Sequence, residues 1–192
     1  MAEQIMVVGC SPRKDGNSDK AAREVDGTLK ELGFDPELVF LRDKKILPCM
    51  GCRSCENTKK NRCILAEKDD VQELLHKMQE VQGIYFCSPI YYYHVPAGFK
   101  ALIDRGQSFY EAWMQGEQAP QAGKKAFCIL IAGRKKGELL FQGSLITMKY
   151  FLQPLGYSLD DLCLRGLDSK QDLATDAGSL EQIRTFVREG AW

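Results

Sequence analysis

The sequence predicts an α/β domain built on a doubly wound parallel sheet of five strands, with helices on both faces. Three observations carry this prediction. Short, almost wholly apolar runs recur along the 192 residues, as expected of strands buried on both faces. Amphipathic segments of helical length separate these runs. No repeat, low-complexity tract or linker divides the chain, so one domain is expected over residues 1–192.

The expected elements alternate strand and helix. Residues 5–10 form a buried strand, and Asn17 or Ser18 caps a helix that runs to Leu32 and closes at Gly33. The later elements are a strand at 37–41, a helix from 69 through 78, a strand at 83–87, a helix at 96–105, a strand at 125–132, a helix at 138–155, a strand at 157–164 and a helix covering 180–187. Such a chain suits the strand order 2-1-3-4-5, in which a ligand lies outside the carboxyl ends of the strands, where the order reverses.

Composition excludes several functional classes. The apolar share is 44%, the charged share is 27%, and 26 basic residues balance 26 acidic ones, so no net field attracts nucleic acid or anionic lipid. No apolar run is long enough to cross a bilayer. The N-terminal segment lacks the features of a secretion signal, which predicts a cytoplasmic location.

The loop after the first strand, Ser11–Ser18, has the composition of a phosphate site. It offers hydroxyls, an amide, a glycine and two cations just before a helix N-terminus, where the backbone N–H groups and the helix dipole favour an anion. It is neither a dinucleotide fingerprint nor a Walker loop. From composition alone, an ordinary polar turn with a capped helix explains the segment equally well.

Two further loops are expected at the same edge of the sheet. The loop Ser88–Pro96 follows the third strand and contains three consecutive tyrosines, of which Tyr91 could lie against a ring system. His94 is more simply a solvated loop residue. The loop 132–137 follows the fourth strand, and Gly133 within it would allow close approach of a ring. Its cations suit either a pyridine-nucleotide phosphate or plain solvent.

The cysteine run is the most informative segment. Four of the eight cysteines occur as Cys49-x2-Cys52-x2-Cys55-x7-Cys63, within an irregular polar loop at 46–68. Three thiolates at every third position can surround one face of a [4Fe–4S] cubane while the fourth closes the other. Structural zinc more often uses two separated Cys-x2-Cys pairs, although four thiolates would satisfy it. The spacing favours a cluster over zinc, and zinc over free thiols.

These motifs together resemble the iron–sulfur flavoprotein group of the NADPH-dependent FMN reductase family, which has a flavodoxin-like fold. The likeness rests on Gly9-Cys10-Ser11-Pro12-Arg13-x-x-Gly16-Asn17-Ser18, on Ser88-Pro89-x-Tyr91 followed by Lys100-x-x-Ile103-Asp104-Arg105, and on Ile46-x-Pro48-Cys49-x-Gly51-Cys52. It covers about half of the chain. By this resemblance the residues that hold the FMN phosphate are Ser11, Arg13, Asn17 and Ser18. Those that border the flavin ring are Ser88, Pro89, Ile90 and Tyr91, with Gly133 at the rim, and the ligands of the cluster are Cys49, Cys52, Cys55 and Cys63. Asp104 and Arg105 are expected to end their helix and to organise nearby loops.

The implied function is an FMN- and iron–sulfur-dependent electron transfer that couples NAD(P)H or a ferredoxin-type donor to a downstream acceptor. The chemistry then belongs to the cofactors, and no side chain acts as a catalytic acid or base. A homodimer or homotetramer is expected, with the cluster loop near a neighbouring subunit's flavin. An exposed cluster is oxygen-labile, so air-exposed protein can lose or exchange it. The alternatives are an NAD(P)H-dependent FMN or quinone reductase without a working cluster, and a metal-stapled binding module.

Overall fold

Five parallel strands form one sheet in the order β2-β1-β3-β4-β5, as predicted. The computed structural model describes residues 4–58, 61–117, 121 and 123–190. The strands are β1 (Ile5–Gly9), β2 (Glu37–Phe40), β3 (Gly83–Pro89), β4 (Lys124–Ala132) and β5 (Tyr157–Arg165). The helices are α1 (Asn17–Glu31), α2 (Ser54–Asn57), α3 (Val71–Glu80), α4 (Ala97–Arg105), α5 (Gln107–Met114), α6 (Gln142–Leu152), α7 (Asp172–Thr175) and α8 (Ala177–Gly190). Short 3-10 turns follow β2 (Leu41–Asp43) and α6 (Gln153–Leu155).

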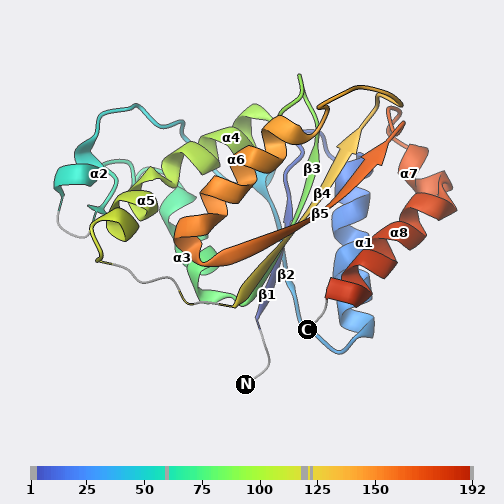
Figure 1. The fold of residues 1–192 in the computed structure, drawn as a ribbon, viewed down its shortest axis with the longest axis horizontal. Coiled ribbons are helices and arrows are strands. Elements are labelled where there is room, and N and C mark those ends of the chain that lie inside the picture. The colour runs from blue at the N-terminus through green and yellow to red at the C-terminus, as the bar shows by residue number, and fades with distance from the viewer. Residues whose placement is uncertain (1–3, 59–60, 118–120, 122, 191–192) are drawn as a thin grey trace.

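Helices cover the two faces of the sheet in separate layers (Figure 1). Helices α1, α7 and α8 pack on one face, where Ile5 and Val7 of β1 join the apolar cluster that includes Val25. Helices α3, α4 and α6 pack on the other, where Met6 and Val8 join a second cluster. Successive strand residues thus face opposite layers and both faces are apolar, which is why the strands read as continuous hydrophobic runs.

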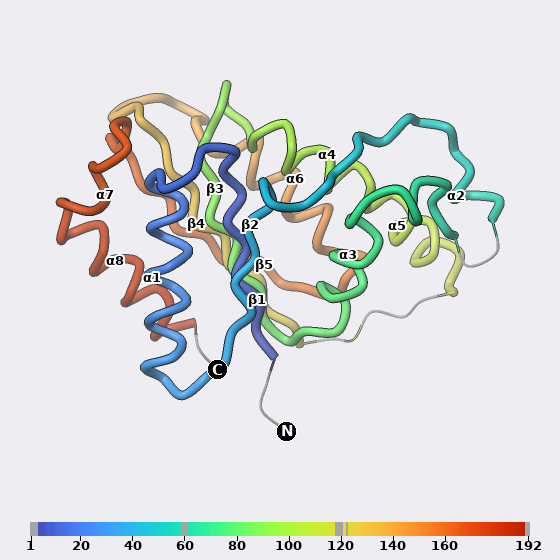
Figure 2. The backbone as a smooth tube through the Cα atoms, turned by 180° about the vertical axis from the view of Figure 1, so that it is seen from behind, coloured from blue at the N-terminus to red at the C-terminus, as the bar shows by residue number. Residues whose placement is uncertain are grey.

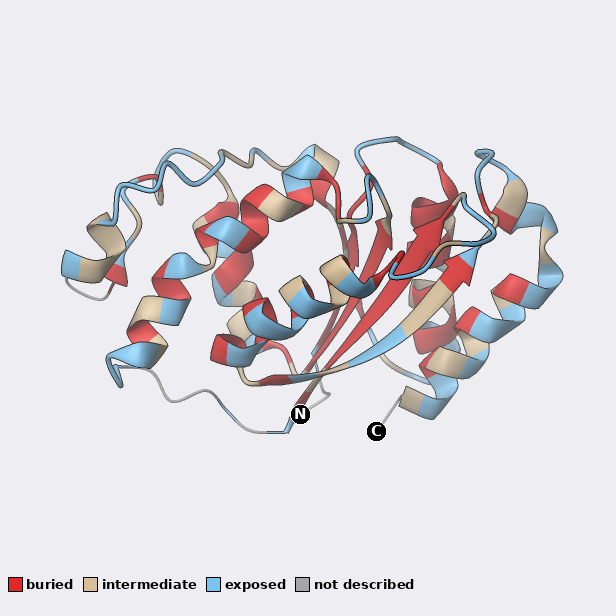
Figure 3. Ribbon diagram, turned by 45° about the horizontal axis from the view of Figure 1, so that its top comes forward, coloured by how far each residue is buried: buried red, intermediate tan, exposed pale blue. Residues whose placement is uncertain are grey.

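The burial of each strand depends on its position in the sheet (Figure 3). The inner strands are buried along nearly their whole length, whereas β5, at the edge of the sheet, is buried only at Tyr157 and Leu164, with half-buried and exposed residues between them. Across the described part of the chain, the helices are too short or too polar to cross a lipid bilayer.

The structure differs from the sequence prediction at both ends of one helix and in three short helices. The helix expected at 138–155 begins only at Gln142, because Leu139 has a left-handed φ of 58°, which a helix cannot contain. The 3-10 turn then replaces the helix after Leu152. The short helices α2 and α7, and the eight-residue α5 that directly follows α4, were not predicted.

The register brings the strand ends together. Gly9, the last residue of β1, pairs with Phe40 of β2 and Cys87 of β3, and Pro89 of β3 pairs with Ile131 of β4. The strand that follows β1 in the chain, β2, lies on one side of β1, and the strand that follows β3, β4, lies on the opposite side of β3. The strand order therefore reverses between β1 and β3. The loops that follow β1, β3 and β4 therefore meet at one edge.

Candidate cofactor sites

The three predicted loops enclose one cavity of about 120 Å³ at the carboxyl ends of the strands. Eight of the nine residues that the sequence predicts for the FMN site line it, namely Ser11, Arg13, Asn17, Ser18, Pro89, Ile90, Tyr91 and Gly133. The ninth, Ser88, is fully buried within β3, where its hydroxyl donates to the carbonyl of Pro89. Gly16 and Ile131 also line the cavity, and so do Leu167 and Asp168, which were missed. Their one sequence signal is their position just beyond the fifth strand.

The first loop is shaped by its own backbone contacts. The hydroxyl oxygen of Ser11 accepts the N–H of Arg13 at 3.1 Å, which folds the chain back directly after β1. A Cβ on Gly16 would approach Nε of Arg13 at 3.3 Å, so the glycine makes room for that side chain. Helix α1 starts at Asn17, and its first N–H groups have no partner within the helix. Together these features make a concave, positively polarised site.

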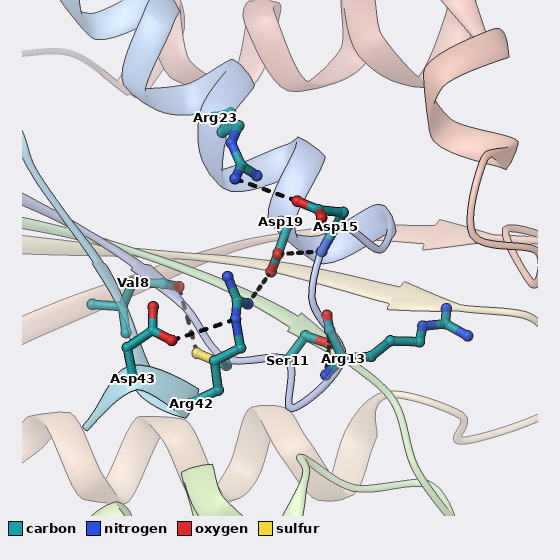
Figure 4. Close-up of polar contacts among 9 residues, drawn as sticks. Val8, Ser11, Arg13, Asp15, Asp19, Arg23, Arg42 and Asp43 are labelled. Atoms are coloured by element: carbon teal, nitrogen blue, oxygen red, sulfur yellow. Dashed lines mark hydrogen bonds and ion pairs between the residues drawn. The ribbon is translucent and has the colours of Figure 1, made fainter. Parts of the chain in front are cut away.

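A buried carboxylate holds the outer side of this loop (Figure 4). Asp19 is fully buried; one of its oxygens accepts the N–H of Asp15 at 2.7 Å and the other pairs with Nη1 of Arg42 at 2.7 Å. Asp15 itself has a left-handed φ of 55°, a conformation that needs such support. The guanidinium carbon of Arg42, which follows β2, lies 4.3 Å from the centre of the Phe40 ring. Asp19 of α1 and Arg42 of the 3-10 turn after β2 therefore position the loop.

The Asn17 side chain joins the loop to the segment after β5. Its amide nitrogen donates to the carbonyls of Leu167 and Ser169, at 3.1 and 2.8 Å, and its amide oxygen accepts the N–H of Leu173 at 3.1 Å. These bonds use both of its N–H donors. Asn17 thus shapes the cavity by holding the opposite wall, and its side chain has no donor left for a ligand.

The second and third loops form the remaining wall. Tyr91 and His94 exchange backbone hydrogen bonds of 2.8 and 3.0 Å, closing a tight turn in which Tyr92 and Tyr93 have left-handed φ angles. Tyr92 is fully exposed, whereas the Tyr93 hydroxyl accepts a hydrogen bond from Arg134 at 3.1 Å. A Cβ on Gly133 would lie 2.4 Å from Oδ1 of Asp168, so any other residue there would require the Asp168 side chain to move.

All four clustered cysteines line a second cavity, of about 410 Å³. Cys49 and Cys52 are exposed, Cys55 and Cys63 are half-buried, and all four thiols are free. A hydrogen bond with Ser54 lowers the pKa of Cys52, while partial burial raises the pKa of Cys55. This cysteine pocket shares no lining residue with the first cavity. It lies between α2 and the junction of α4 with α5, and the segment that leads to it from β2 is visible in Figure 2.

The donor set of the cysteine pocket suits a polynuclear group. A single tetrahedral ion, with metal–sulfur bonds of about 2.3 Å, would draw its ligands to within about 4 Å of one another. Among the described residues, no three metal-binding side chains converge in that way. Four cysteine thiols are a donor set that iron–sulfur clusters use, and here they line one cavity of about 410 Å³.

Comparison with known proteins identifies the family. The family model for NADPH-dependent FMN reductases matches residues 4–153. The chain belongs to the NADPH-dependent FMN reductase family. It is therefore a member of a group of flavin-dependent oxidoreductases, and the flavodoxin-like fold expected from the sequence is confirmed.

Several curated relatives of this FMN reductase family member are named iron-sulfur flavoproteins. One from Methanocaldococcus jannaschii is 36% identical over 104 residues, which are 54% of this chain and 52% of that protein. One from Archaeoglobus fulgidus is 32% identical over 176 residues, 88% of this chain and 74% of that protein. The chain thus spans about half the length of some relatives and about three quarters of another.

Solved structures share the fold at low sequence identity. An azoreductase from Bacillus anthracis superposes with a TM-score of 0.73 at 12% identity, covering 98% of this chain and all of that one. An NAD(P)H:quinone oxidoreductase from Methanothermobacter marburgensis gives 0.66 at 16% identity, covering 98% and 97%. At such identities the likeness concerns the fold alone.

Proposed function

We propose that this chain is an electron-transfer flavoprotein that binds FMN in the cavity at the strand ends and a [4Fe–4S] cluster in the cysteine pocket. One observation carries the proposal: a member of the FMN reductase family has four free cysteines that line one cavity separate from the predicted flavin cavity. The names of the curated relatives support it. When bound, FMN supplies one- and two-electron chemistry and the cluster supplies one-electron transfer.

The residues at the strand ends would bind and orient the phosphate end of FMN. Ser11 and Ser18 supply hydroxyls, Arg13 supplies a charge, and the first N–H groups of α1 supply the helix dipole. A cavity of about 120 Å³ is smaller than the 300 Å³ or more usual for a complete ligand site, so the ring system would extend past Tyr91 and Gly133 to the open rim.

The electron partners follow from the same arrangement. NAD(P)H, the donor typical of the family, would reduce the flavin at the open rim, and a ferredoxin-type carrier would exchange electrons at the exposed cysteine pocket. The two cavities are lined by separate residues of the same chain, so we propose a homodimer or homotetramer in which the pocket of one subunit approaches the flavin of another. Free thiolate ligands require reducing surroundings, which favours the cytoplasm.

Anaerobic purification tests this function. Absorption spectroscopy with FMN, iron and sulfide analysis should give one FMN and about four irons and four sulfides per chain. Cys49→Ser should remove the iron and keep the flavin, while Cys163→Ser, at a half-buried cysteine outside the pocket, should keep both. Flavin without iron under strict anoxia would contradict the cluster and leave a plain NAD(P)H-dependent reductase. A colourless protein that fails to bind added FMN would contradict the whole proposal.

A further inference from the structure

A fully buried ion pair lies behind the cysteine pocket. Arg105, the last residue of α4, donates from Nη1 to Oδ2 of Asp69 at 2.6 Å and from Nη2 to Oδ1 at 3.3 Å. The two side chains are 1% and 0% exposed. Removing a carboxylate and a guanidinium from water is costly, and apolar residues of similar volume are often as stable, so stability alone is a weak reason for such a pair.

The pair fixes the start of the cysteine segment. Nη1 of Arg105 also donates to the carbonyl of Leu47 at 3.1 Å, and Oδ2 of Asp69 accepts the N–H of the same residue at 2.9 Å. Both backbone groups of Leu47, two residues before Cys49, are therefore held by one buried pair. This anchors an otherwise irregular segment to helices α3 and α4.

The other side of Arg105 faces the cysteines. Arg105 lines the cysteine pocket together with Cys63. Burial lowers the pKa of its guanidinium, but the hydrogen bond with Asp69 and the charge of Cys63 outweigh burial and raise it. Its Nε atom is buried and has no hydrogen-bond partner among the residues that the structure describes. Arg105 lines the pocket and Asp69 does not, so the positive end of the ion pair and one unused donor lie at the edge of the pocket.

We propose that Arg105 is a positioning residue that raises the reduction potential of the metal group held by the four cysteines, by applying its buried charge and its free N–H at the sulfur of Cys63. The inference rests on the proposed function. Uptake of one electron from an external donor makes that group more negative by one charge, with no bond formed or broken in the chain. A fixed cation stabilises the more negative state, and the effect is large where solvent is excluded.

Arg53 provides a matched comparison within the same pocket. It also lines the cavity, but its side chain is 77% exposed and it pairs with Glu56 at 2.7 Å. Both arginines pair with a carboxylate, but solvent screens the charge of exposed Arg53 and is excluded around the buried pair of Arg105 and Asp69. An effect on the potential that came only from the number of positive charges near the cysteines would be similar for the two arginines. We expect the effect on the reduction potential to be confined to Arg105.

The test is an anaerobic redox titration of the protein with dithionite as the reductant, in which electron paramagnetic resonance measures the reduced metal group. Arg105→Gln should lower the equilibrium constant for one-electron reduction at least about tenfold, a shift of 59 mV or more. Arg105→Lys, which keeps the charge, should recover most of that shift. Arg53→Gln should stay within about threefold of the unmodified protein.

A second pair of variants covers the case in which Arg105→Gln folds poorly because Asp69 is left unpaired. Arg105→Gln combined with Asp69→Asn removes both charges, and its potential should still lie below that of Asp69→Asn alone. Equal potentials in those two proteins, or in Arg105→Gln and Arg53→Gln, would overturn the role of Arg105 while leaving the cluster itself established. Unmodified protein that binds no iron or sulfide under anoxia would overturn this inference and the proposed cluster together.

Discussion

The loop after β1 and the cysteine segment after β2 are both polar and irregular, yet the fold holds them in opposite ways. Asp19 and Asn17 fix the first loop through hydrogen bonds within the loop, to the turn after β2 and to the segment after β5. The cysteine segment projects from the sheet, with two exposed and two half-buried thiols and one short helix, and its buried attachment at Leu47 precedes the first cysteine. We therefore expect the loop after β1 to be formed before any ligand binds, and the cysteine segment to gain rigidity from its ligand.

The largest expected effect comes from breaking the support of the first loop. Asp19→Ala leaves the Asp15 N–H without its acceptor and the partly buried Arg42 with only its longer pair to Asp43, and we expect a loss of about 3–5 kcal/mol in the free energy of unfolding. FMN affinity should fall as well. Chemical denaturation and flavin titration measure both. Glu73→Ala, which removes an exposed pair with Lys77, should cost less than about 1 kcal/mol. Similar losses in the two variants would contradict the prebuilt loop.

The next largest effect concerns the ligand groups of that loop. Arg13→Ala should weaken FMN binding about 10- to 100-fold, as expected from the loss of a charge-assisted hydrogen bond worth about 1.5–3 kcal/mol. Lys14→Ala is the control, because Lys14 is exposed and outside the cavity lining. Fluorescence titration of the apoprotein gives both dissociation constants. Equal weakening by the two variants would indicate nonspecific attraction instead of a defined phosphate site.

Protease sensitivity sharpens the comparison between the regions. Without iron, we expect cleavage within 49–63 to be at least about tenfold faster than in the cluster-loaded protein, because a bound ligand stabilises only the folded arrangement. The loop 11–18 should resist cleavage in both forms. Mass spectrometry of limited digests made in anoxic buffer locates the cuts. An apoprotein as resistant at 49–63 as the loaded form would mean that the cysteine pocket is rigid without its ligand.

The smallest effect is a pH dependence at the attachment of the cysteine segment. Burial opposes ionisation of Asp69, but hydrogen bonds from Arg105 and Leu47 outweigh it and hold its pKa below the ordinary value. A carboxyl whose pKa is lowered by folding stabilises the protein above its unfolded pKa of about 3.9, and that contribution is lost as the pH falls through the folded pKa. Denaturation followed from about pH 5 down to about pH 2 should show a steeper loss of stability in the unmodified protein than in Asp69→Asn. Stability profiles that fall equally with pH in the two proteins would contradict this contribution of Asp69.

The order of the strands and the meeting of the three loops could be predicted from the sequence because both follow from the βα alternation and from parallel topology. The resemblance placed Ser88 beside the flavin with Pro89, Ile90 and Tyr91, but the Ser88 side chain is fully buried within β3 and lies outside the cavity lining. Asp19 and Arg42 were missed because their pairing joins residues from different elements. Leu139 delays the start of the helix predicted from 138, through a backbone conformation that periodicity does not report.

The central claim is that one chain holds two separate cofactor sites, and a crystal structure of anoxically purified protein, with data collected at the iron absorption edge, tests it most directly. We expect a flavin phosphate beside Ser11 and Ser18, and iron anomalous density enclosed by Cys49, Cys52, Cys55 and Cys63. Flavin density away from the ends of β1 and β3, or iron bound elsewhere than among these cysteines, would contradict it.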